Sequence, residues 1–160
     1  MDEAIPRRAA RILVIDGERV LLFRCTSANR PQDGPWWITP GGGLEGTEDA
    51  RWGAVRELTE ETGLVVEPTE FRGPVFEEEI EYPTSTGPQR QRQQYFVLFH
   101  PAFEVDRQFQ TDWERRFMGE ARWWNSAELR ESGETVYPPN LADLLDQVIV
   151  PTDGLLAKED

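Results

Sequence analysis

Short apolar runs separated by polar turns dominate the first forty residues, as in a protein built around a β-sheet. Two β-rich runs, 11–16 and 19–24, flank a tight turn at Gly17 and predict a hairpin. The proline- and glycine-containing residues 26–35 predict an exposed loop. Residues 36–38 predict a brief strand that precedes three consecutive glycines.

Residues 47–62 have the pattern of an amphipathic helix. Ala54 and Leu58 are four residues apart and begin an apolar face that would lie against a core. Thr47 is the expected N-cap residue. Gly63 stands where a left-handed residue commonly ends a helix.

The rest of the chain predicts more strands and a closing helix. Strands are expected within 64–76, at 95–99 and at 121–125, and the polar residues 84–94 are expected to form a hairpin loop. Leucines at helical spacing predict a helix at 140–150.

The sequence shows no repeat and no linker, so we expect one domain over 1–150 and a flexible tail at 151–160.

Charge narrows the classes of function. The 160 residues include 17 Lys and Arg and 30 Asp and Glu, for a net charge of −13. The only lysine is Lys158, in the tail. So acidic a protein repels nucleic-acid phosphates, which disfavours binding to long nucleic acids. Any phosphate ligand therefore needs local arginines or a divalent cation.

The sequence also bears on location. It contains no apolar stretch of about 18 residues, so we expect no membrane span. Residues 1–11 lack the apolar segment of a secretory signal. Cys25 is the only cysteine and has no partner for an intramolecular disulfide. These observations favour the cytoplasm.

Three glutamates carry the main chemical signal. Glu57, Glu60 and Glu61 stand at i, i+3 and i+4, so a helix presents all three carboxylates on one face. Crowded like charges destabilise a bare helix, whereas hard carboxylate oxygens suit Mg²⁺ or Mn²⁺. Arg56 can hold a neighbouring carboxylate in a fixed orientation. The pattern therefore predicts a divalent metal site.

The glycines before this helix add a second feature. Gly41, Gly42 and Gly43 allow the backbone to approach a ligand closely, because they carry no side chain. A loop that leads into a helix N-terminus also favours anions. We expect these glycines to contact substrate.

The spacing from Gly42 to Leu64 resembles the Nudix box of the Nudix (MutT-like) hydrolases, G-x5-E-x7-R-E-U-x-E-E-x-G-U, where U is apolar. All nine fixed positions are met within 23 of the 160 residues. The match includes Glu48, which seven residues separate from Arg56, and Gly63 near its end. Few short motifs are as specific.

The resemblance implies a fold, a reaction and roles for the residues of the box. Family members form an α/β/α sandwich with a mixed sheet and hydrolyse a nucleoside diphosphate linked to another group. The residues that match Glu57, Glu60 and Glu61 bind divalent metal, with the backbone carbonyl of Gly42 as a further ligand. Glu57 would also orient or deprotonate water. Arg56 would position Glu57, and Glu48 would stabilise the loop.

Outside the box, no motif supports the candidate residues. The family often takes another acidic ligand or base from a separate loop, and Glu120 is favoured over Glu114 and over the acidic run 77–79. Arg24 at the end of a strand is a candidate phosphate ligand. Trp36 and Trp37 are candidates to stack on a base. Because adjacent residues of a strand face opposite ways, we expect one of the two tryptophans to lie in the core.

Several alternatives remain open at this level. A Nudix-like sensor would bind a nucleotide without turnover, although such proteins usually have a damaged metal helix. An isomerase of isoprenoid diphosphates would need a second catalytic signature that the sequence does not show. The substrates that remain are ADP-ribose, nucleotide sugars, dinucleoside polyphosphates and modified nucleoside triphosphates. A homodimer is neither indicated nor excluded.

Overall fold

The computed structural model describes residues 6–27 and 34–149. The predicted tail at 151–160 and residues 28–33 of the predicted loop lie outside the described part. Within it, no helix combines the length and the apolar composition needed to cross a bilayer.

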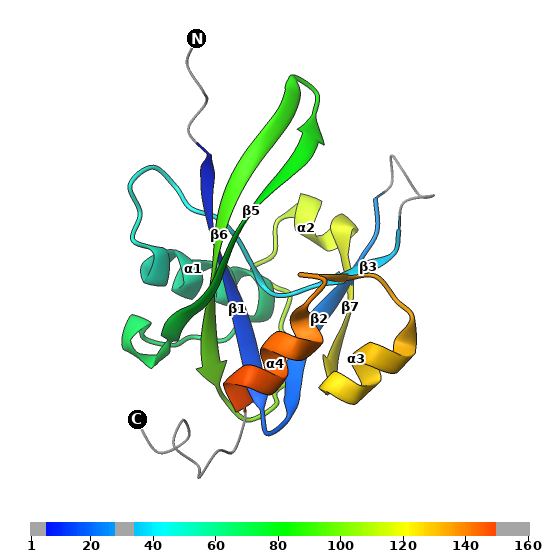
Figure 1. Ribbon diagram of the computed structural model, residues 1–160. Helices are drawn as coiled ribbons and strands as arrows, with labels where there is room; N and C mark the ends of the chain where they lie inside the picture. The colour runs from blue at the N-terminus through cyan, green and yellow to red at the C-terminus, as the bar shows by residue number, and fades with distance from the viewer. Residues whose placement is uncertain (1–5, 28–33, 150–160) are drawn as a thin grey trace.

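A mixed β-sheet forms the centre of the molecule (Figure 1). Its main strand order is β5-β6-β1-β2-β3-β8, with β4 paired to β1 and β7 paired to β2. The β1–β6 and β3–β8 pairs are parallel, and the other pairs are antiparallel. The strands are β1 (Arg7–Asp16), β2 (Arg19–Cys25), β3 (Trp36–Ile38), β4 (Gly41–Gly43), β5 (Arg72–Thr84), β6 (Gly87–Phe99), β7 (Met118–Trp124) and β8 (Val136–Tyr137).

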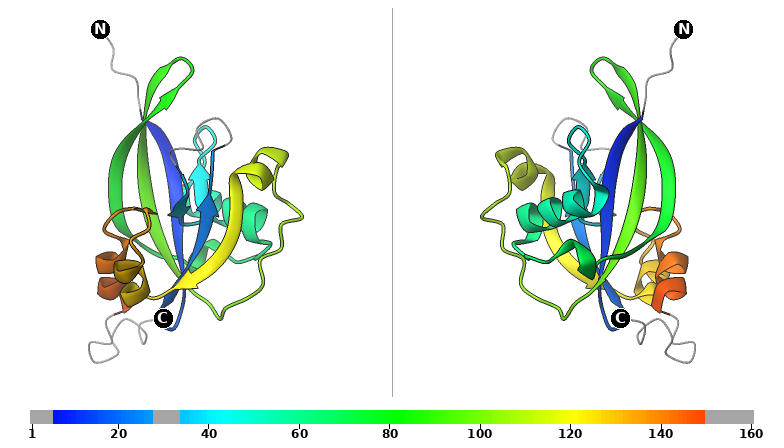
Figure 2. Two further views of the ribbon diagram at one scale, coloured as in Figure 1. Left: turned by 90° about the vertical axis from the view of Figure 1, so that its right-hand side faces the viewer. Right: turned by 90° about the vertical axis from the view of Figure 1, so that its left-hand side faces the viewer.

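Helices cover both faces of this sheet, as the two side views show (Figure 2). Helix α1 (Ala50–Thr62) packs through Ala54 and Leu58 on a cluster that includes Ile12 and Phe96. Helices α3 (Ser126–Ser132) and α4 (Leu141–Ile149) lie on the opposite face. The short helices η2 (Pro68–Glu70) and α2 (Asp112–Phe117) complete the set. The predicted α/β/α sandwich with a mixed sheet is confirmed.

The closing helix and the first hairpin agree with expectation. In α4, Leu141, Leu144, Leu145 and Val148 are buried against the sheet. The hairpin of β1 and β2 pairs Asp16 with Arg19 across the Gly17 turn. Both elements combine a regular apolar pattern with burial on one face, which is the information that periodicity carries.

Helix α1 begins later than predicted. Asp49, not Thr47, is the N-cap: its carboxylate accepts bonds from the backbone N–H groups of Arg51 and Trp52. Thr47 and Asp49 can both accept hydrogen bonds at a helix N-terminus, and the sequence alone does not show which of them is the N-cap. Gly63 ends the helix with φ 80°, as predicted.

The expected hairpin loop at 84–94 was wrong. Residues 87–94 belong instead to strand β6, and only residues 85–86 separate the strands of a long β-hairpin, in which β5 and β6 pair from Phe76–Tyr95 to Thr84–Gly87. The hairpin extends beyond the helical layers (Figure 1), so its side chains need not be apolar. The polar composition of residues 87–94 therefore led to the prediction of a loop where the chain forms a strand.

Candidate active site

Arg56 joins the glycine strand β4 to helix α1. Its guanidinium forms two 2.9 Å bonds with Glu48, through Nε and Nη2. Nη2 also donates to the carbonyl of Gly43 at 3.1 Å, and Nη1 donates to Glu57 at 2.9 Å. Arg56 holds the pKa of Glu48 below its usual value. One side chain thus fixes the loop and the orientation of the Glu57 carboxylate.

Glu57 and Glu61 are buried charges on successive turns of α1. They are only 8% and 4% exposed. Burial, followed by repulsion from Glu60, raises the pKa of Glu57. The pKa of Glu61 is raised strongly, first by burial and then by Glu57. The N–H of Gly41 donates to Glu61 at 2.8 Å and offsets part of this cost.

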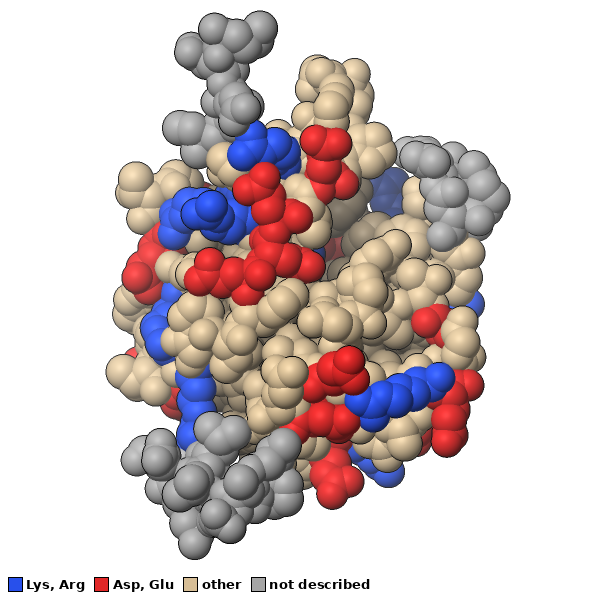
Figure 3. Space-filling model, in the orientation of Figure 1, with Lys and Arg blue, Asp and Glu red and all other residues tan. Residues whose placement is uncertain are grey.

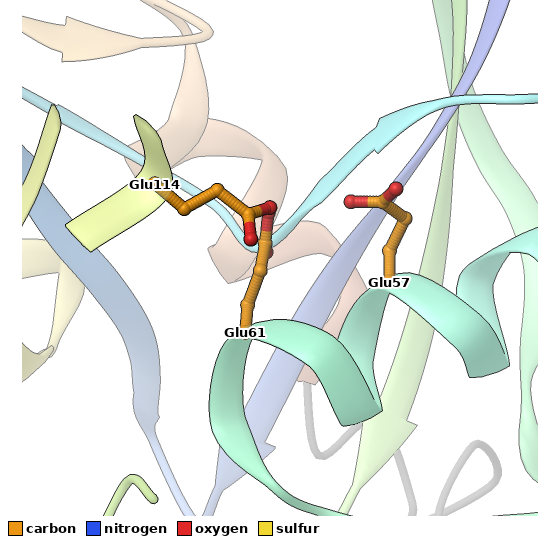
Figure 4. Close-up of side chains that lie close together, drawn as sticks. All are labelled: Glu57, Glu61 and Glu114. Carbon is orange, nitrogen blue, oxygen red and sulfur yellow. The ribbon is translucent and has the colours of Figure 1, made fainter. Parts of the chain in front are cut away.

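A third carboxylate reaches the pair from another element. Glu114 on α2 comes together with Glu57 and Glu61, with one oxygen of each within 4.8 Å of the others (Figure 4). Thr111 caps α2 and exchanges reciprocal bonds with Glu114 through backbone and side chain. Glu114 was a weaker sequence candidate than Glu120. Glu120 is exposed and lies outside this group.

Gln110 connects the segment before α2 to the end of α1. Its buried side chain donates from Nε2 to the carbonyl of Glu61 at 2.9 Å. The N–H of Asp106 donates to the carbonyl of Thr62 at 2.9 Å. These two bonds hold the segment that carries Glu114 against the glutamates of α1. Nothing in the local sequence marked Gln110 for this position.

Glu60 is placed differently from the other two glutamates of the box. Its side chain is 35% exposed, and its nearest cationic contact is Arg56 Nη1 at 3.5 Å. It lines the same cleft but is not in the group of three converging oxygens. Its role as a ligand stays a prediction.

A cleft of about 1300 Å³ opens over the carboxylates. Figure 3 shows acidic side chains gathered along β5, beside a hollow in the surface. The glycines Gly41, Gly42 and Gly43 line the cleft, and their contact with substrate stays a prediction. A Cβ added to Gly42 would lie 2.6 Å from Glu57 Oε1, so glycine leaves room there for the carboxylate.

The carbonyl of Gly42 points toward strand β1. Gly42 is opposite Ala10, between the bonds Ile12 N–H to Pro40 and Leu44 N–H to Arg8. By the alternation of an antiparallel ladder, Gly42 and Ala10 form a hydrogen-bonded pair. One lone pair of this carbonyl is therefore engaged with β1, and its role as a metal ligand stays a prediction.

The two tryptophans before the glycines have different environments. Trp37 is 2% exposed, packs edge-to-face on Trp124 and donates its indole N–H to Glu134 at 2.7 Å. Trp36 lines the cleft and contacts Phe117 edge-to-face. One of the pair is thus in the core, as expected, and Trp36 is the one available to a ligand.

Arg24 does not reach the cleft. It is exposed on β2, and its ladder partner is Trp37 on β3. It is absent from the residues that line the cleft within the described chain. Cys25, which sequence analysis gave no role, is buried, and burial raises the pKa of its thiol to about 12.

The donor set fits a divalent cation. Glu57, Glu61 and Glu114 offer hard oxygen ligands of the kind that Mg²⁺ and Mn²⁺ prefer. The raised pKa values of Glu57 and Glu61 show that the metal-free cluster resists full ionisation. A bound cation would remove that cost.

Comparisons with known proteins agree with this fold. The NUDIX domain model matches residues 5–145. The E. coli dihydroneopterin triphosphate pyrophosphohydrolase superposes with a TM-score of 0.65 at 16% identity, over 92% of this chain and 99% of that one. A MutT protein from Methanosarcina mazei gives 0.62 at 20% identity, over 92% and 95%.

One curated protein is similar over a short segment. An RNA pyrophosphohydrolase from Dinoroseobacter shibae is 58% identical over 36 residues, which is 22% of this chain and 22% of that protein. This match spans about a fifth of each protein, whereas the domain match covers most of the chain. The fold, the complete box and the domain match together show that the chain belongs to the Nudix hydrolase family.

Proposed function

We propose that this protein is a magnesium-dependent pyrophosphohydrolase that cleaves the pyrophosphate link of a nucleoside diphosphate derivative. The observation that carries the proposal is the convergence of Glu57, Glu61 and Glu114 beside a glycine-lined cleft. Mn²⁺ is the alternative cation, since it prefers the same oxygen ligands.

The residues of the site have two proposed roles, which are to bind the cation and to activate water. Glu57, Glu61 and Glu114 would hold the cation, with Glu60 at the cleft wall. Bound Mg²⁺ would neutralise the pyrophosphate and make phosphorus more electrophilic. Glu57, one oxygen of which is held by Arg56, would also orient the attacking water or take a proton from it.

Arg56 keeps that base in position. Its bonds to Glu48 and Gly43 fix the guanidinium, and Nη1 then holds one oxygen of Glu57. Arg56 acts through Glu57 and is therefore a positioning residue. Most of the catalytic effect would come from positioning and charge, as in phosphoryl transfer generally.

A hydrolysis screen tests the proposal. The purified chain is incubated with ADP-ribose, nucleotide sugars, dinucleoside polyphosphates and modified nucleoside triphosphates, with Mg²⁺ or with EDTA. Coupled phosphatase detection reports the products. We expect turnover of at least one substrate in Mg²⁺ and none in EDTA.

Two variants make the screen specific to the cluster. Glu57→Gln should reduce kcat by orders of magnitude, because it removes both a ligand and the base. Glu131→Gln, an exposed glutamate on α3, removes the same charge away from the cleft and should leave kcat unchanged. Nucleotide binding without turnover in any condition would identify a sensor instead.

A further inference from the structure

A polar hydrogen-bond network lines the cleft on the β5–β6 hairpin. Gln91 and Gln93 are buried, and Gln91 Nε2 donates to Gln93 Oε1 at 2.8 Å. Gln93 Nε2 donates to Glu78 Oε2 at 2.9 Å, and the hydroxyl of Tyr95 donates to the same oxygen at 3.0 Å. All four side chains line the cleft. The proposed mechanism uses none of them.

The ends of the network fix the direction of every bond. Arg11 Nε approaches Gln93 Oε1 at 3.4 Å, and a guanidinium can only donate. The amide oxygen of Gln93 must therefore face Arg11, and its NH₂ group must face Glu78. An ionised carboxylate can only accept, so the network ends at Glu78.

This arrangement leaves one oxygen of Glu78 for a ligand. Both of these bonds go to Oε2, and within residues 6–27 and 34–149 no side chain or backbone group donates to Oε1. Glu78 is partly buried and lines the cleft. The cleft therefore presents an acceptor of fixed orientation with two lone pairs.

Aromatic side chains also line the cleft. Trp36, Trp113 and Phe117 are among its lining residues, and Trp113 stacks on Phe117 with ring centroids 4.6 Å apart. Trp113 is 62% exposed, which is unusual for so large an apolar group. Such rings are suited to stacking against a planar base.

Glu78 and the glycine strand β4 lie on the same row of the sheet. Glu78 is paired with Gln93, Gln93 with Ala9, and Ala9 with Gly43. Three strand spacings correspond to roughly 14 Å between the backbones of Glu78 and Gly43. A nucleotide whose base reaches Glu78 can thus extend its phosphates toward the glycine strand.

We infer that Glu78 selects for a base that offers adjacent N–H donors, so that the preferred substrate class is a guanine nucleotide. This inference rests on the proposed function for the identity of the ligand as a nucleotide. Guanine places its ring N–H beside an amino group, and both can donate to Oε1. Adenine and cytosine place a ring nitrogen acceptor beside their amino group, and that lone pair would face the carboxylate. Uracil flanks its single N–H with two carbonyls.

Glu78→Gln tests the inference because the network dictates how glutamine will sit. Gln93 and Tyr95 both donate toward the Oε2 position, so the new amide oxygen takes that place. The amide NH₂ group then replaces Oε1 and turns the acceptor into a donor. Glu77→Gln is the matched control, because Glu77 is the exposed neighbour on β5 and does not line the cleft.

The measurement is calorimetric binding of GDP, ADP, CDP and UDP to the full chain in Mg²⁺. We expect wild-type protein and Glu77→Gln to bind GDP on the order of tenfold more tightly than the other three. Glu78→Gln should lose this preference. Equal binding of all four nucleotides by wild type, or a guanine preference that survives in Glu78→Gln, would overturn the inference.

The role of Glu78 and the proposed hydrolase activity can be refuted independently of each other. A guanine preference without turnover of any substrate would refute the hydrolase and leave the role of Glu78 standing. Turnover without base preference would refute the role of Glu78 alone. Trp113→Ala should weaken the binding of all four nucleotides by a similar factor, since stacking does not depend on the hydrogen-bonding edge of the base.

Discussion

Replacing Glu61 by glutamine should stabilise the metal-free protein while it disables the cation site. Glu61 is 4% exposed, and its pKa is raised strongly by burial and by Glu57. Its hydrogen bond comes from the N–H of Gly41 at 2.8 Å. Glutamine has the same shape and an amide oxygen for that bond. The substitution therefore removes a buried charge and keeps the packing.

The sign of the pH dependence follows from the raised pKa. A carboxyl group whose folded-state pKa exceeds its unfolded value favours folding most at pH values below the unfolded pKa, about 4.3. That contribution is lost as pH rises through the folded-state pKa, and each pKa unit corresponds to about 1.4 kcal/mol. Without metal, Glu61 therefore costs the fold stability at neutral and alkaline pH.

Coulomb's law gives the scale of this cost. The three carboxylates approach within 4.8 Å, and two unit charges at that distance repel by roughly 3 kcal/mol at an effective dielectric constant of about 20. Partial protonation relieves some of the repulsion. We expect Glu61→Gln to raise the free energy of unfolding by about 1–3 kcal/mol in EDTA at pH 8, and by much less at pH 4.

Urea unfolding of wild type and variant, in EDTA and in Mg²⁺, measures both effects. Magnesium should stabilise the wild type and have little effect on Glu61→Gln, whose kcat should fall by orders of magnitude. A variant that is less stable than wild type in EDTA at pH 8, and gains as much from Mg²⁺, would refute the view of this cluster as mutually repelling cation ligands.

Three other substitutions test the geometry of the site. Gly42→Ala should lower kcat about a hundredfold with the fold retained, because its Cβ would displace the Glu57 carboxylate; kinetics and circular dichroism measure the two effects. Gln110→Ala should raise the Mg²⁺ concentration for half-maximal activity at least about tenfold, since it frees the segment tied to Glu61, and a magnesium titration measures this. Gly63→Ala should cost about 1–2 kcal/mol of stability in urea unfolding, because the helix ends there with φ 80°.

The sequence specified helix α1 and the placement of its glutamates well, because the information that determines them is local. The spacing of Glu57, Glu60 and Glu61 fixes which face of a helix they share, and Gly63 marks where the helix ends. Arg56 lies in the same register, so its contact with Glu57 also follows from spacing. Each of these relations spans fewer than ten residues of chain.

Glu114 could not be selected in this way. It lies 53 residues after Glu61, on a six-residue helix whose position depends on the bonds of Gln110 and Asp106 to the end of α1. Glu120 is a similar residue in the same part of the sequence, and only the three-dimensional path of the segment separates the two. A long-range contact of this kind has no signature in spacing.

The polar first part of β6, residues 87–94, was missed for a different reason, although the strand at 95–99 was predicted. Gln91 and Gln93 are buried, yet they face a cleft and each other instead of an apolar core. Sequence periodicity predicts a strand from alternating apolar residues. A strand whose buried side chains are polar and face a cleft lacks that pattern and is therefore predicted as a loop. The error thus occurred where the chain departs from simple patterning, at residues that line the proposed ligand site.

The arrangement of charge in the cleft explains why so acidic a protein can act on phosphates. The arginines that line the cleft already have partners: Arg56 binds Glu48 and Glu57, Arg11 binds the carbonyls of Thr39 and Gly41, and Arg7 binds Tyr82. They shape the site more than they neutralise a ligand. The positive charge that a pyrophosphate requires would therefore come from the cation, and the same cation relieves the repulsion among the glutamates that hold it. Binding of metal and binding of substrate would thus both depend on one cluster of carboxylates.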